Sequence, residues 1–316
     1  MSIKLENKTL PLPLVSVGLP TYNRGFLLKC AIESVLNQDY PNIELIISDN
    51  ASTDETMMIC QETCRKDNQV RYFRQPYNIG PTKNFINVLS EAKGDFFMWL
   101  SDDDWIDSSY ISACVTELNS DPMLVSVGGI GKSYEDDVFL NKCRPINLDQ
   151  PKATDRVLAY FAEVGDNSIL FGVTRREQLI RILMRNTMGA DWLLVAALAF
   201  IGKLKTLNSV SIHRNRKFSS SSSIKKIRTT LGLPIYQQFF PHISIAVSAF
   251  SDIVWKNPVF ADLNNCKRYF FGARVFLQII FFKGIIQNTK AMIIKIIEIF
   301  VGEDGYKKIR FLILGR

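Results

Sequence analysis

Residues 96–104 read FFMWLSDDD, an apolar run that passes directly into a serine and three aspartates. The five apolar residues (96–100) predict a buried strand, and the aspartates mark the point where it ends. Three neighbouring carboxylates at a strand end repel one another and are only partly hydrated. A divalent cation relieves this repulsion, because Mg²⁺ and Mn²⁺ take oxygen ligands and leave positions for phosphate oxygens and water. The triplet by itself also fits a solvated acidic turn.

The first 130 residues alternate between strand and helix signals. Strands are expected at 14–19, 43–48, 70–74 and 96–100, and helices at 25–37, 52–65 and 81–92. Ser52 and Glu55 have the capping-box spacing, which predicts that the second helix begins at Ser52. Strands that alternate with helices predict an α/β fold with a parallel, helix-covered sheet. Ligands of such sheets bind beyond the carboxyl ends of the strands, so residues 20–24, 49–54 and 101–104 should meet at one rim.

Beyond residue 125 the pattern is less regular. Strands are expected at 125–130, 168–173 and 204–212, and helices at 175–185 and 191–200. Residues 214–228 contain five consecutive serines flanked by Lys and Arg, which is typical of a low-complexity basic loop. This loop is the predicted domain boundary, and the sequence after it is aromatic, basic and helical in pattern.

The charge of the chain is unevenly distributed. The 316 residues are 47% hydrophobic and 22% charged, which excludes a disordered, collagenous or fibrous protein. The formal charge of +7 divides into −7 for residues 1–200 and +14 for residues 201–316. Such asymmetry suggests that a basic region meets an anionic partner, which could be a nucleic acid, a phospholipid or a phosphorylated substrate.

Cysteine usage and hydropathy bear on the compartment. The six cysteines form no CxxC pair and lie far from both histidines, which favours reduced thiols over a zinc site. Residues 1–13 have no apolar stretch of the kind found in secretory signals, and no run reaches the ~18 apolar residues of a membrane span. We therefore expect a cytoplasmic chain without a spanning helix, although a helix lying on the bilayer surface is compatible with the sequence.

Five motifs follow one another at the predicted strand ends. They are PTYNR (20–24), DNASTD (49–54), NIG (78–80), Asn84 and SDDD (101–104). This ordered set resembles the nucleotide-sugar-binding half of the family 2 glycosyltransferases of the GT-A fold. The resemblance implies a Rossmann-like, mostly parallel central sheet with flanking helices, in a nucleotide-sugar-binding and catalytic domain over residues 1–220. A mainly helical, basic region would follow over residues 221–316.

The resemblance also implies a donor site. Tyr22 would offer a ring to the nucleobase and Asp49 would read the base or the ribose. The full donor-binding set that it implies is Pro20, Tyr22, Asn23, Arg24, Asp49, Asn50, Gly80, Lys83, Asn84, Ser101 and Asp102. The residue types alone leave open that Tyr22 packs on the next helix, that Asp49 caps a helix and that Lys83 is solvated surface.

The family's acidic motif is Asp-x-Asp-Asp, and Ser101 stands here at the position of its first aspartate. Asp103 would be the principal metal ligand, with Asp102 near the ribose and Asp104 as a further ligand. A shift of this register by one residue is also compatible with the sequence. The resemblance implies that Mn²⁺ or Mg²⁺ bridges the donor diphosphate and offsets the charge of the departing nucleotide.

The segment Gly189–Ala190–Asp191–Trp192 resembles the acceptor-side motif of the family, with Ala190 in place of its first acid. Asp191 would be the catalytic base that takes the proton of the acceptor hydroxyl, and Trp192 would stack on the acceptor sugar. A helix N-cap is the structural alternative for Asp191. Membership of the family implies inversion at the anomeric carbon in a single displacement.

The segment HRNRK (213–217) is similar to the basic loop that closes over the donor diphosphate in this family. His213, Arg214 and Arg216 would face the diphosphate, with a metal-ligand role as an alternative for His213. A solvated loop is the structural alternative for all three.

From residue 224 onward, Phe, Ile and Trp alternate with Lys and Arg, for example at 269–282 and 292–301. These segments fit either a helical subdomain or peripheral attachment to an anionic leaflet. Nucleic-acid binding would leave the acidic rim unexplained.

The resemblance thus implies a metal-dependent, inverting hexosyl- or deoxyhexosyltransferase at the inner face of the cytoplasmic membrane. It would add one sugar from a nucleotide-diphosphate sugar to a lipid-linked O-antigen or capsule repeat unit. Transfer to teichoic acid or protein, and non-catalytic nucleotide or glycan binding, are the alternatives.

Overall fold

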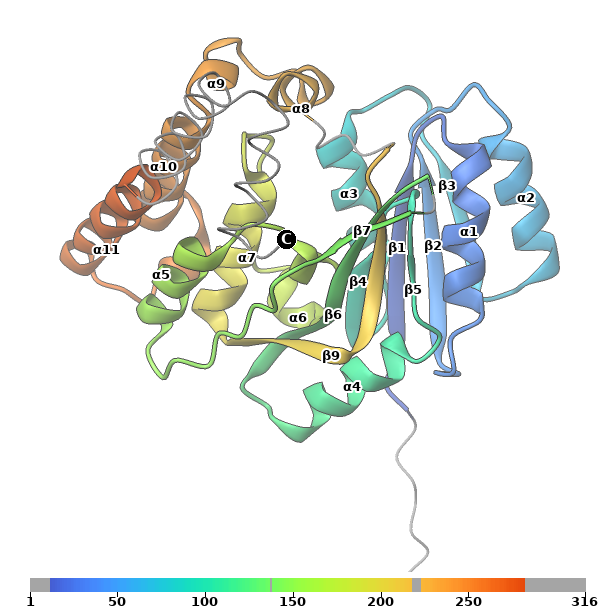
Figure 1. Cartoon of the computed structure of the whole chain (residues 1–316), viewed down its shortest axis with the longest axis horizontal. Helices are drawn as coiled ribbons and strands as arrows, with labels where there is room; N and C mark the ends of the chain where they lie inside the picture. Colours follow the sequence, from blue (N-terminus) through green and yellow to red (C-terminus); the bar gives the residue numbers. More distant parts are fainter. Residues whose placement is uncertain (1–11, 137, 218–222, 282–316) are drawn as a thin grey trace, which may run out of the picture.

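The computed structural model of the chain describes residues 12–136, 138–217 and 223–281 (Figure 1). Its first part alternates strands and helices as the sequence predicts. These elements are β1 (Val15–Thr21), α1 (Gly25–Leu36), β2 (Ile43–Asp49), α2 (Thr56–Lys66), β3 (Val70–Arg74), α3 (Pro81–Ser90) and β4 (Phe96–Trp99).

The second part adds shorter strands and a cluster of helices. Up to residue 215 they are β5 (Asp104–Ile106), α4 (Tyr110–Ser120), β6 (Leu124–Glu135), β7 (Val138–Lys142), α5 (Ala153–Glu163), the 3₁₀ helix η1 (Ser168–Phe171), β8 (Val173–Arg175), α6 (Arg176–Leu179), α7 (Ala190–Ile201) and β9 (Lys203–Asn215). After them come α8 (Ile224–Leu231), α9 (Tyr236–Phe239), α10 (Pro241–Ser251), the π-helical turn η3 (Asp252–Lys256), the 3₁₀ helix η4 (Pro258–Phe260) and α11 (Asn265–Gln278).

All described strands belong to one sheet in the order β3-β2-β1-β4-β8-β6-β9-β5, with β7 paired to β6. The first four strands are parallel, and Val15 of β1 lies opposite both Ile43 of β2 and Phe96 of β4. Beyond β4 the directions are mixed, because β8 runs antiparallel to β4 and β6 while β6 and β9 are parallel. The predicted α/β class is confirmed, with the parallel arrangement concentrated in the N-terminal half.

The parallel strands are buried because helices cover both faces of the sheet. Every residue of β1, β2 and β4 is buried, which explains their near-continuous apolar runs. At Gly18 in β1, a Cβ atom would lie 2.7 Å from side-chain atoms of Val88 in α3 and Phe97 in β4. Only glycine therefore allows α3 to pack this closely on β1.

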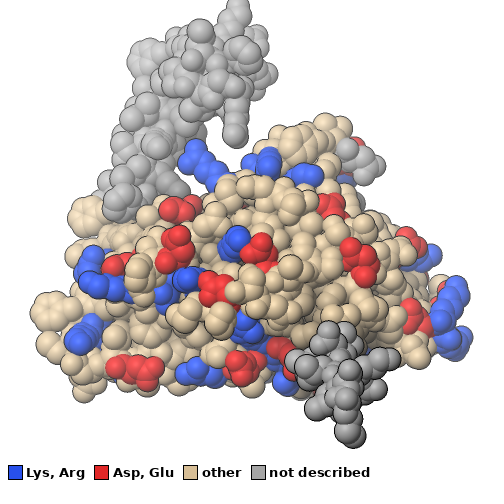
Figure 2. Space-filling view, turned by 90° about the horizontal axis from the view of Figure 1, so that it is seen from below, with Lys and Arg blue, Asp and Glu red and all other residues tan. Residues whose placement is uncertain are grey.

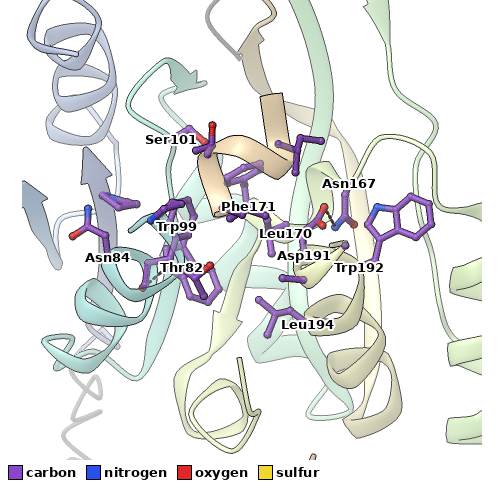
Figure 3. Close-up of a pocket in the computed structure, with 18 of the residues that line it drawn as sticks. Thr82, Asn84, Trp99, Ser101, Asn167, Leu170, Phe171, Asp191, Trp192 and Leu194 are labelled. Carbon is purple, nitrogen blue, oxygen red and sulfur yellow. Dashed lines mark hydrogen bonds between the residues drawn. The ribbon is translucent and has the colours of Figure 1, made fainter. Parts of the chain in front are cut away.

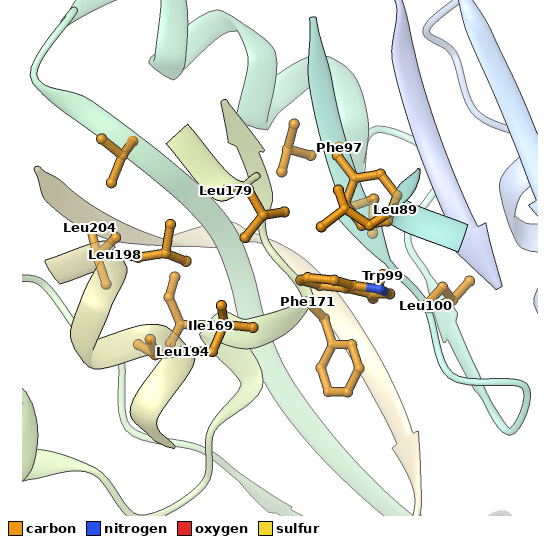
Figure 4. Packing of buried hydrophobic residues seen from close by; sticks show 14 of the residues in the cluster. Leu89, Phe97, Trp99, Leu100, Ile169, Phe171, Leu179, Leu194, Leu198 and Leu204 are labelled. Atoms are coloured by element: carbon orange, nitrogen blue, oxygen red, sulfur yellow. The ribbon is translucent and has the colours of Figure 1, made fainter. Parts of the chain in front are cut away.

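A second part of the core lies between the sheet and α7. Figure 4 shows Leu194 and Leu198 of α7 packed beside Ile169 of η1, with Trp99 and Phe171 at the edge nearest β4. In Figure 1, α5 and α7–α11 lie on the opposite side of the sheet from α1 and α2. Within the described parts of the chain, no helix combines the length and apolar character that crossing a bilayer requires.

The predicted start of the second helix is wrong. The helix begins at Thr56, and the Asp54 carboxylate accepts the Thr56 N–H at 3.1 Å. The Ser52 hydroxyl instead accepts the backbone N–H of Asn23 at 2.8 Å and so joins the turn after β2 to the turn after β1. A long-range contact thus outweighs the local capping pattern.

Two predictions beyond residue 125 are also wrong. Residues 168–171 form a 3₁₀ turn instead of a strand, since the N–H of Leu170 donates to the carbonyl of Asn167 at 3.0 Å. The helix expected over 175–185 ends at Leu179, and Arg185 reaches Asp252 in an ion pair of 2.6 Å. The helix expected at 292–301 and the predicted boundary at 220–221 lie outside the described residues.

Candidate active site

A cavity of about 1100 Å³ opens where β1, β2 and β4 end. The turns after these strands form one wall, and the opposite wall comes from residues 165–167, the start of α7 and the end of β9. Residues of α8 and α10 close a third side with mainly apolar side chains. The volume is at the upper end of the range for small-molecule sites, so the cavity has room for a large ligand or for two.

The structure brings most of the predicted site residues together in this cavity. Parallel strands place their carboxyl ends at one edge, and Thr21 of β1 lies opposite Asp49 of β2. The predicted residues that line the cavity are Pro20, Tyr22, Arg24, Asn50, Asn84, Ser101, Asp102, Asp103, Asp104, Asp191, Trp192, Arg214 and Arg216. Figure 3 shows Asn84 and Trp99 on one side of the cavity and Asp191, Asn167 and Trp192 on the other.

Asp49 is outside the cavity lining and fully buried. Its carboxylate accepts the Ser52 N–H at 2.8 Å and the Tyr72 hydroxyl at 2.9 Å, and it lies 3.4 Å from Arg74. These contacts hold the turn after β2. The cavity-facing residue of this turn is Asn50, whose carboxamide oxygen accepts the N–H of Ile79 at 2.8 Å.

Four other predicted residues are not among those that line the cavity. The exposed Asn23 accepts the Thr53 N–H at 2.8 Å, while Lys83 is an exposed residue of α3. Gly80 precedes α3 with a φ of 84°, a conformation that favours glycine.

His213 also lies outside the cavity, and residues 213–215 belong to β9 instead of a loop. Its Nε2 lies 2.7 Å from Asp107 and its Nδ1 3.1 Å from the Tyr134 hydroxyl. The imidazole stacks on Trp105 with ring centroids 5.1 Å apart. These contacts join β5 to β9 and β6.

The three aspartates after β4 divide into two groups. Arg24 contacts Asp103 at 2.7 Å and lies 3.8 Å from Asp102. Asp104 is buried at the start of β5, where it accepts the Asn215 N–H at 3.1 Å and lies 3.7 Å from Arg214. Burial and the neighbouring Asp103 carboxylate raise the pKa of Asp102 to about 7, and the same two causes raise the pKa of Asp104.

The chemistry of this acidic cluster fits a divalent cation. The raised pKa of Asp102 shows that its negative charge is costly in this position, and a cation would relieve that cost. Among the described residues, no three His, Cys, Asp or Glu side chains form a complete metal site. A Mg²⁺ or Mn²⁺ ion held by Asp102 and Asp103 would therefore complete its ligand set with oxygens of a phosphate ligand and water.

Asp191 lies in the first turn of α7, two residues after Gly189, the N-cap residue, which has a φ of 70°. One carboxylate oxygen accepts the side-chain N–H of Asn167 at 3.1 Å. Burial raises the pKa of Asp191, while the hydrogen bonds from Asn167 and from the N–H of Trp192 act in the opposite direction. A carboxylate with a raised pKa on a cavity wall has the properties of a general base.

Sequence reasoning missed Asp166 and Asn167, which line the cavity before η1. Asp166 accepts hydrogen bonds from Arg214 at 2.9 Å and from Arg216 at 2.6 Å, and so holds both arginines on the wall near the acidic cluster. The only signal in the sequence is the polar turn Gly165–Asp166–Asn167 ahead of an apolar run.

Comparison with known protein families gives a clear match. Residues 16–183 match the family model described as Glycosyl transferase family 2. One curated relative is the GalNAc(5)-diNAcBac-PP-undecaprenol beta-1,3-glucosyltransferase of Campylobacter jejuni, 39% identical over 34% of this chain and 35% of that protein. The chondroitin synthase of Escherichia coli is 24% identical over 84% of this chain and 37% of its own length. The chain therefore spans little more than a third of the length of these relatives.

Solved structures share the fold. TarS of S. aureus in complex with UDP-GlcNAc superimposes with a TM-score of 0.58 at 18% identity, over 85% of this chain and 73% of that one. The mannosyltransferase PcManGT of Pyrobaculum calidifontis with GDP-Man and Mn²⁺ gives a TM-score of 0.53 at 16% identity, over 83% and 74%. At these identities the similarity shows a common GT-A fold.

Replacing Asp102 by asparagine should stabilise the metal-free protein increasingly as the pH rises from 5 to 8. Because the pKa of Asp102 is about 7 in the folded state against an ordinary 3.8, the folded state binds its proton more tightly. The corresponding stability is present at low pH and is lost as the pH rises through about 7. Asparagine does not ionise, so the variant avoids this loss.

Thermal unfolding in the presence of a chelator checks this prediction. The melting temperature of Asp102→Asn relative to the original protein should increase with pH, whereas the exposed Asp262→Asn should show no trend. A difference for Asp102→Asn that is constant or decreases with pH would contradict the electrostatic description of the cluster.

Proposed function

Because the chain belongs to Glycosyl transferase family 2, we propose that it moves one sugar from a nucleoside-diphosphate sugar to a hydroxyl of a glycan acceptor, with inversion at the anomeric carbon. The observation that carries the proposal is that an acidic cluster, a carboxylate of raised pKa and two arginines line a single cavity. These groups are what glycosyl transfer needs: a place for the diphosphate, a base and charge to balance the leaving group.

The donor occupies the wall formed by β1, β2 and β4. Tyr22 is 44% exposed at the rim, where its ring can stack on a nucleobase. Asn50 lines the same wall, with its carboxamide held by hydrogen bonds to Ile79 and Asn78. Asn84 is buried, and both ends of its amide are hydrogen-bonded to Ser48, so it supports this wall.

Asp102 and Asp103 would hold Mg²⁺ or Mn²⁺ together with the donor diphosphate. The ion would supply Lewis-acid chemistry at the leaving phosphate. Arg24, which contacts Asp103, is next to the same position and can pair with a phosphate oxygen when the carboxylate takes another partner. The PcManGT structure, which contains Mn²⁺ and GDP-Man, supports the use of a divalent cation.

Asp191 removes the proton of the acceptor hydroxyl from the opposite wall. As this oxygen forms its bond to the anomeric carbon, the bond from that carbon to the diphosphate oxygen breaks. The leaving nucleoside diphosphate takes the bonding electrons and faces the positive charge of Arg214 and Arg216. Attack and departure on opposite sides of the carbon invert its configuration. Trp192 and the apolar wall of α8 and α10 receive the acceptor.

The acceptor is carried by a lipid diphosphate at the inner face of the cytoplasmic membrane. The Campylobacter relative is named for a PP-undecaprenol substrate. Residues 223–281 carry seven Lys or Arg against two Asp or Glu, while the face seen in Figure 2 mixes both signs. An exposed apolar stripe runs along the same helices, and it comprises Tyr236, Phe240, Ile243, Val247, Trp255 and Tyr269. Aromatic and basic side chains in this combination suit an anionic membrane surface.

Donor binding should depend on Asp103. Nucleotide sugars of UDP, GDP, CDP and dTDP are tested with Mn²⁺, and at least one should raise the melting temperature of the protein. Asp103→Ala should weaken that binding at least tenfold, because one carboxylate ligand of the ion is lost. Glu62→Gln, on the exposed surface of α2, is the matched acidic control. Stabilisation by no donor, or equal binding by Asp103→Ala, would contradict the proposal.

Asp191→Asn should retain donor and metal binding while transfer falls at least a hundredfold, the lower range for loss of a general base. The measurement is release of nucleoside diphosphate and transfer to lipid-linked acceptors. Asp155→Asn, in the first turn of α5 and outside the cavity, provides the control for an aspartate at a helix start. Undiminished transfer by Asp191→Asn would assign the base to another residue.

The full chain should bind vesicles that contain anionic lipid and release them at high salt. Phe240 and Trp255 are 57% and 62% exposed, and replacing both by serine should lower partitioning at least tenfold through lost apolar burial. Phe26→Ser with Met58→Ser removes side chains of similar exposure (61% and 63%) from α1 and α2 and should have no effect. Equal partitioning of the two double variants would contradict the membrane assignment.

A further inference from the structure

A buried hydrogen-bond chain runs behind the carboxylate of Asp191. The hydroxyl of Tyr160 in α5 donates to the side-chain oxygen of Asn167 at 2.9 Å. The Asn167 Nδ2 donates in turn to Asp191 Oδ2 at 3.1 Å (Figure 3). Tyr160 is fully buried and Asn167 is 8% exposed, so water does not replace these contacts.

We infer that Asn167 is a positioning residue for the base, holding the ionised carboxylate of Asp191 toward the cavity, and that the Tyr160 hydroxyl in turn holds the Asn167 amide in place. The inference rests on the proposed function, because it takes Asp191 as the base. Asn167 does not touch the reacting atoms in this arrangement and acts through Asp191.

The direction of each hydrogen bond follows from the donor and acceptor capacities of the groups. An ionised carboxylate only accepts, so Asn167 must present its Nδ2 to Asp191 and its Oδ1 to the other side. The Tyr160 hydroxyl on that side can donate to Oδ1. If the amide turned by 180°, its oxygen would face the carboxylate and two acceptors would meet. The carboxylate therefore selects this orientation of the amide, and the Tyr160 hydroxyl supports it by donating to Oδ1.

The backbone around Asn167 is fixed independently of Asp191. The preceding residue, Asp166, is held by Arg214 in β9 and by Arg216 just after it. The carbonyl of Asn167 accepts the N–H of Leu170 in the 3₁₀ turn that follows. A rigid turn thus supports both the arginines that face the leaving group and the amide that faces the base.

Other charged or titratable groups share the cavity with Asp191 and set the background for its ionisation. They are Tyr22 and Arg24 after β1, the acidic cluster after β4, Asp166 before η1, Arg185 ahead of α7, Arg214 and Arg216 at the end of β9, and His242 of α10. None of them replaces a hydrogen bond to Oδ2. Removing the Asn167 donor should therefore disfavour the ionised form of Asp191 even with these charges unchanged.

The direct test is the titration of Asp191 in the full-length protein by NMR, with ¹³C at the aspartate side-chain carboxyl carbon. The Asp191 signal is identified by its absence in Asp191→Asn. Asn167→Ala should raise the pKa of Asp191 by about one unit, the size expected when a carboxylate loses one charge-assisted hydrogen bond. Asn167→Asp should raise it further, because a second carboxylate would face the first.

Tyr160→Phe keeps the ring and removes only the hydroxyl, so it tests the chain if the Asn167 variants fold poorly. It should raise the pKa of Asp191 in the same direction and by less than Asn167→Ala. Tyr110→Phe is the matched control, since Tyr110 is also fully buried and its hydroxyl donates to the carbonyl of Phe171. It should leave the titration of Asp191 unchanged. An unchanged pKa in both Asn167→Ala and Tyr160→Phe would overturn the inference.

The pH dependence of nucleoside diphosphate release separates this inference from the proposed function. UDP-GlcNAc and GDP-mannose with Mn²⁺ serve as probes. In Asn167→Ala the acid limb of the profile should move up with the pKa of Asp191, whereas a purely structural defect would lower activity equally at every pH. Suppose that Asp191→Asn has normal activity while Asn167→Ala still raises the pKa of Asp191 in the NMR titration. This result would refute the base assignment alone. A profile that is unchanged in Asn167→Ala, with Asp191→Asn inactive, would refute the positioning role alone.

Discussion

The repulsion among the carboxylates of Asp102, Asp103 and Asp104 is the constraint on which the cavity depends. These side chains follow the buried strand β4, where water cannot hydrate them fully. Burial and the Asp103 carboxylate raise the pKa of Asp102 to about 7. The protein offsets this charge with cations from distant parts of the chain, Arg24 after β1 and Arg214 in β9. Asp166 then balances the second arginine. Acidic and basic side chains therefore alternate along the cavity wall, and a diphosphate with its cation can pair with both kinds.

The same arrangement connects the two sides of the proposed reaction. Asp166 and Asn167 are neighbours in one turn, yet the first contacts Arg214 and Arg216 at the end of β9 and the second contacts Asp191 of α7. The arginines that would face the leaving group and the carboxylate that would accept the proton are thus held by two adjacent residues. The helices after residue 222 complete the enclosure on the inner side of α10 and expose an apolar stripe on its outer side.

Much of this arrangement could be predicted because it follows from strand ends. The apolar runs of β1, β2 and β4 are buried on both faces, so the order of the elements and the rim that carries Tyr22 and Asp103 follow from the pattern. The family match over residues 16–183 covers this same region. Predictions fail where a long-range contact determines the position of a side chain. Ser52 accepts a hydrogen bond from Asn23 instead of starting α2. Asp49 is buried against Tyr72 and Arg74 instead of facing the cavity. For Asn167 the sequence shows only a polar turn, and its role was missed because its partners come from α5 and α7.

The central claim is that the donor diphosphate and its cation bind beside Asp103, across the cavity from Asp191. A crystal structure with Mn²⁺ and the bound nucleoside diphosphate, read through the anomalous scattering of manganese, tests this most directly. We expect a manganese peak within coordination distance of the Asp103 carboxylate and of the diphosphate oxygens. A diphosphate bound elsewhere, or a manganese peak without contact to Asp102 or Asp103, would contradict it.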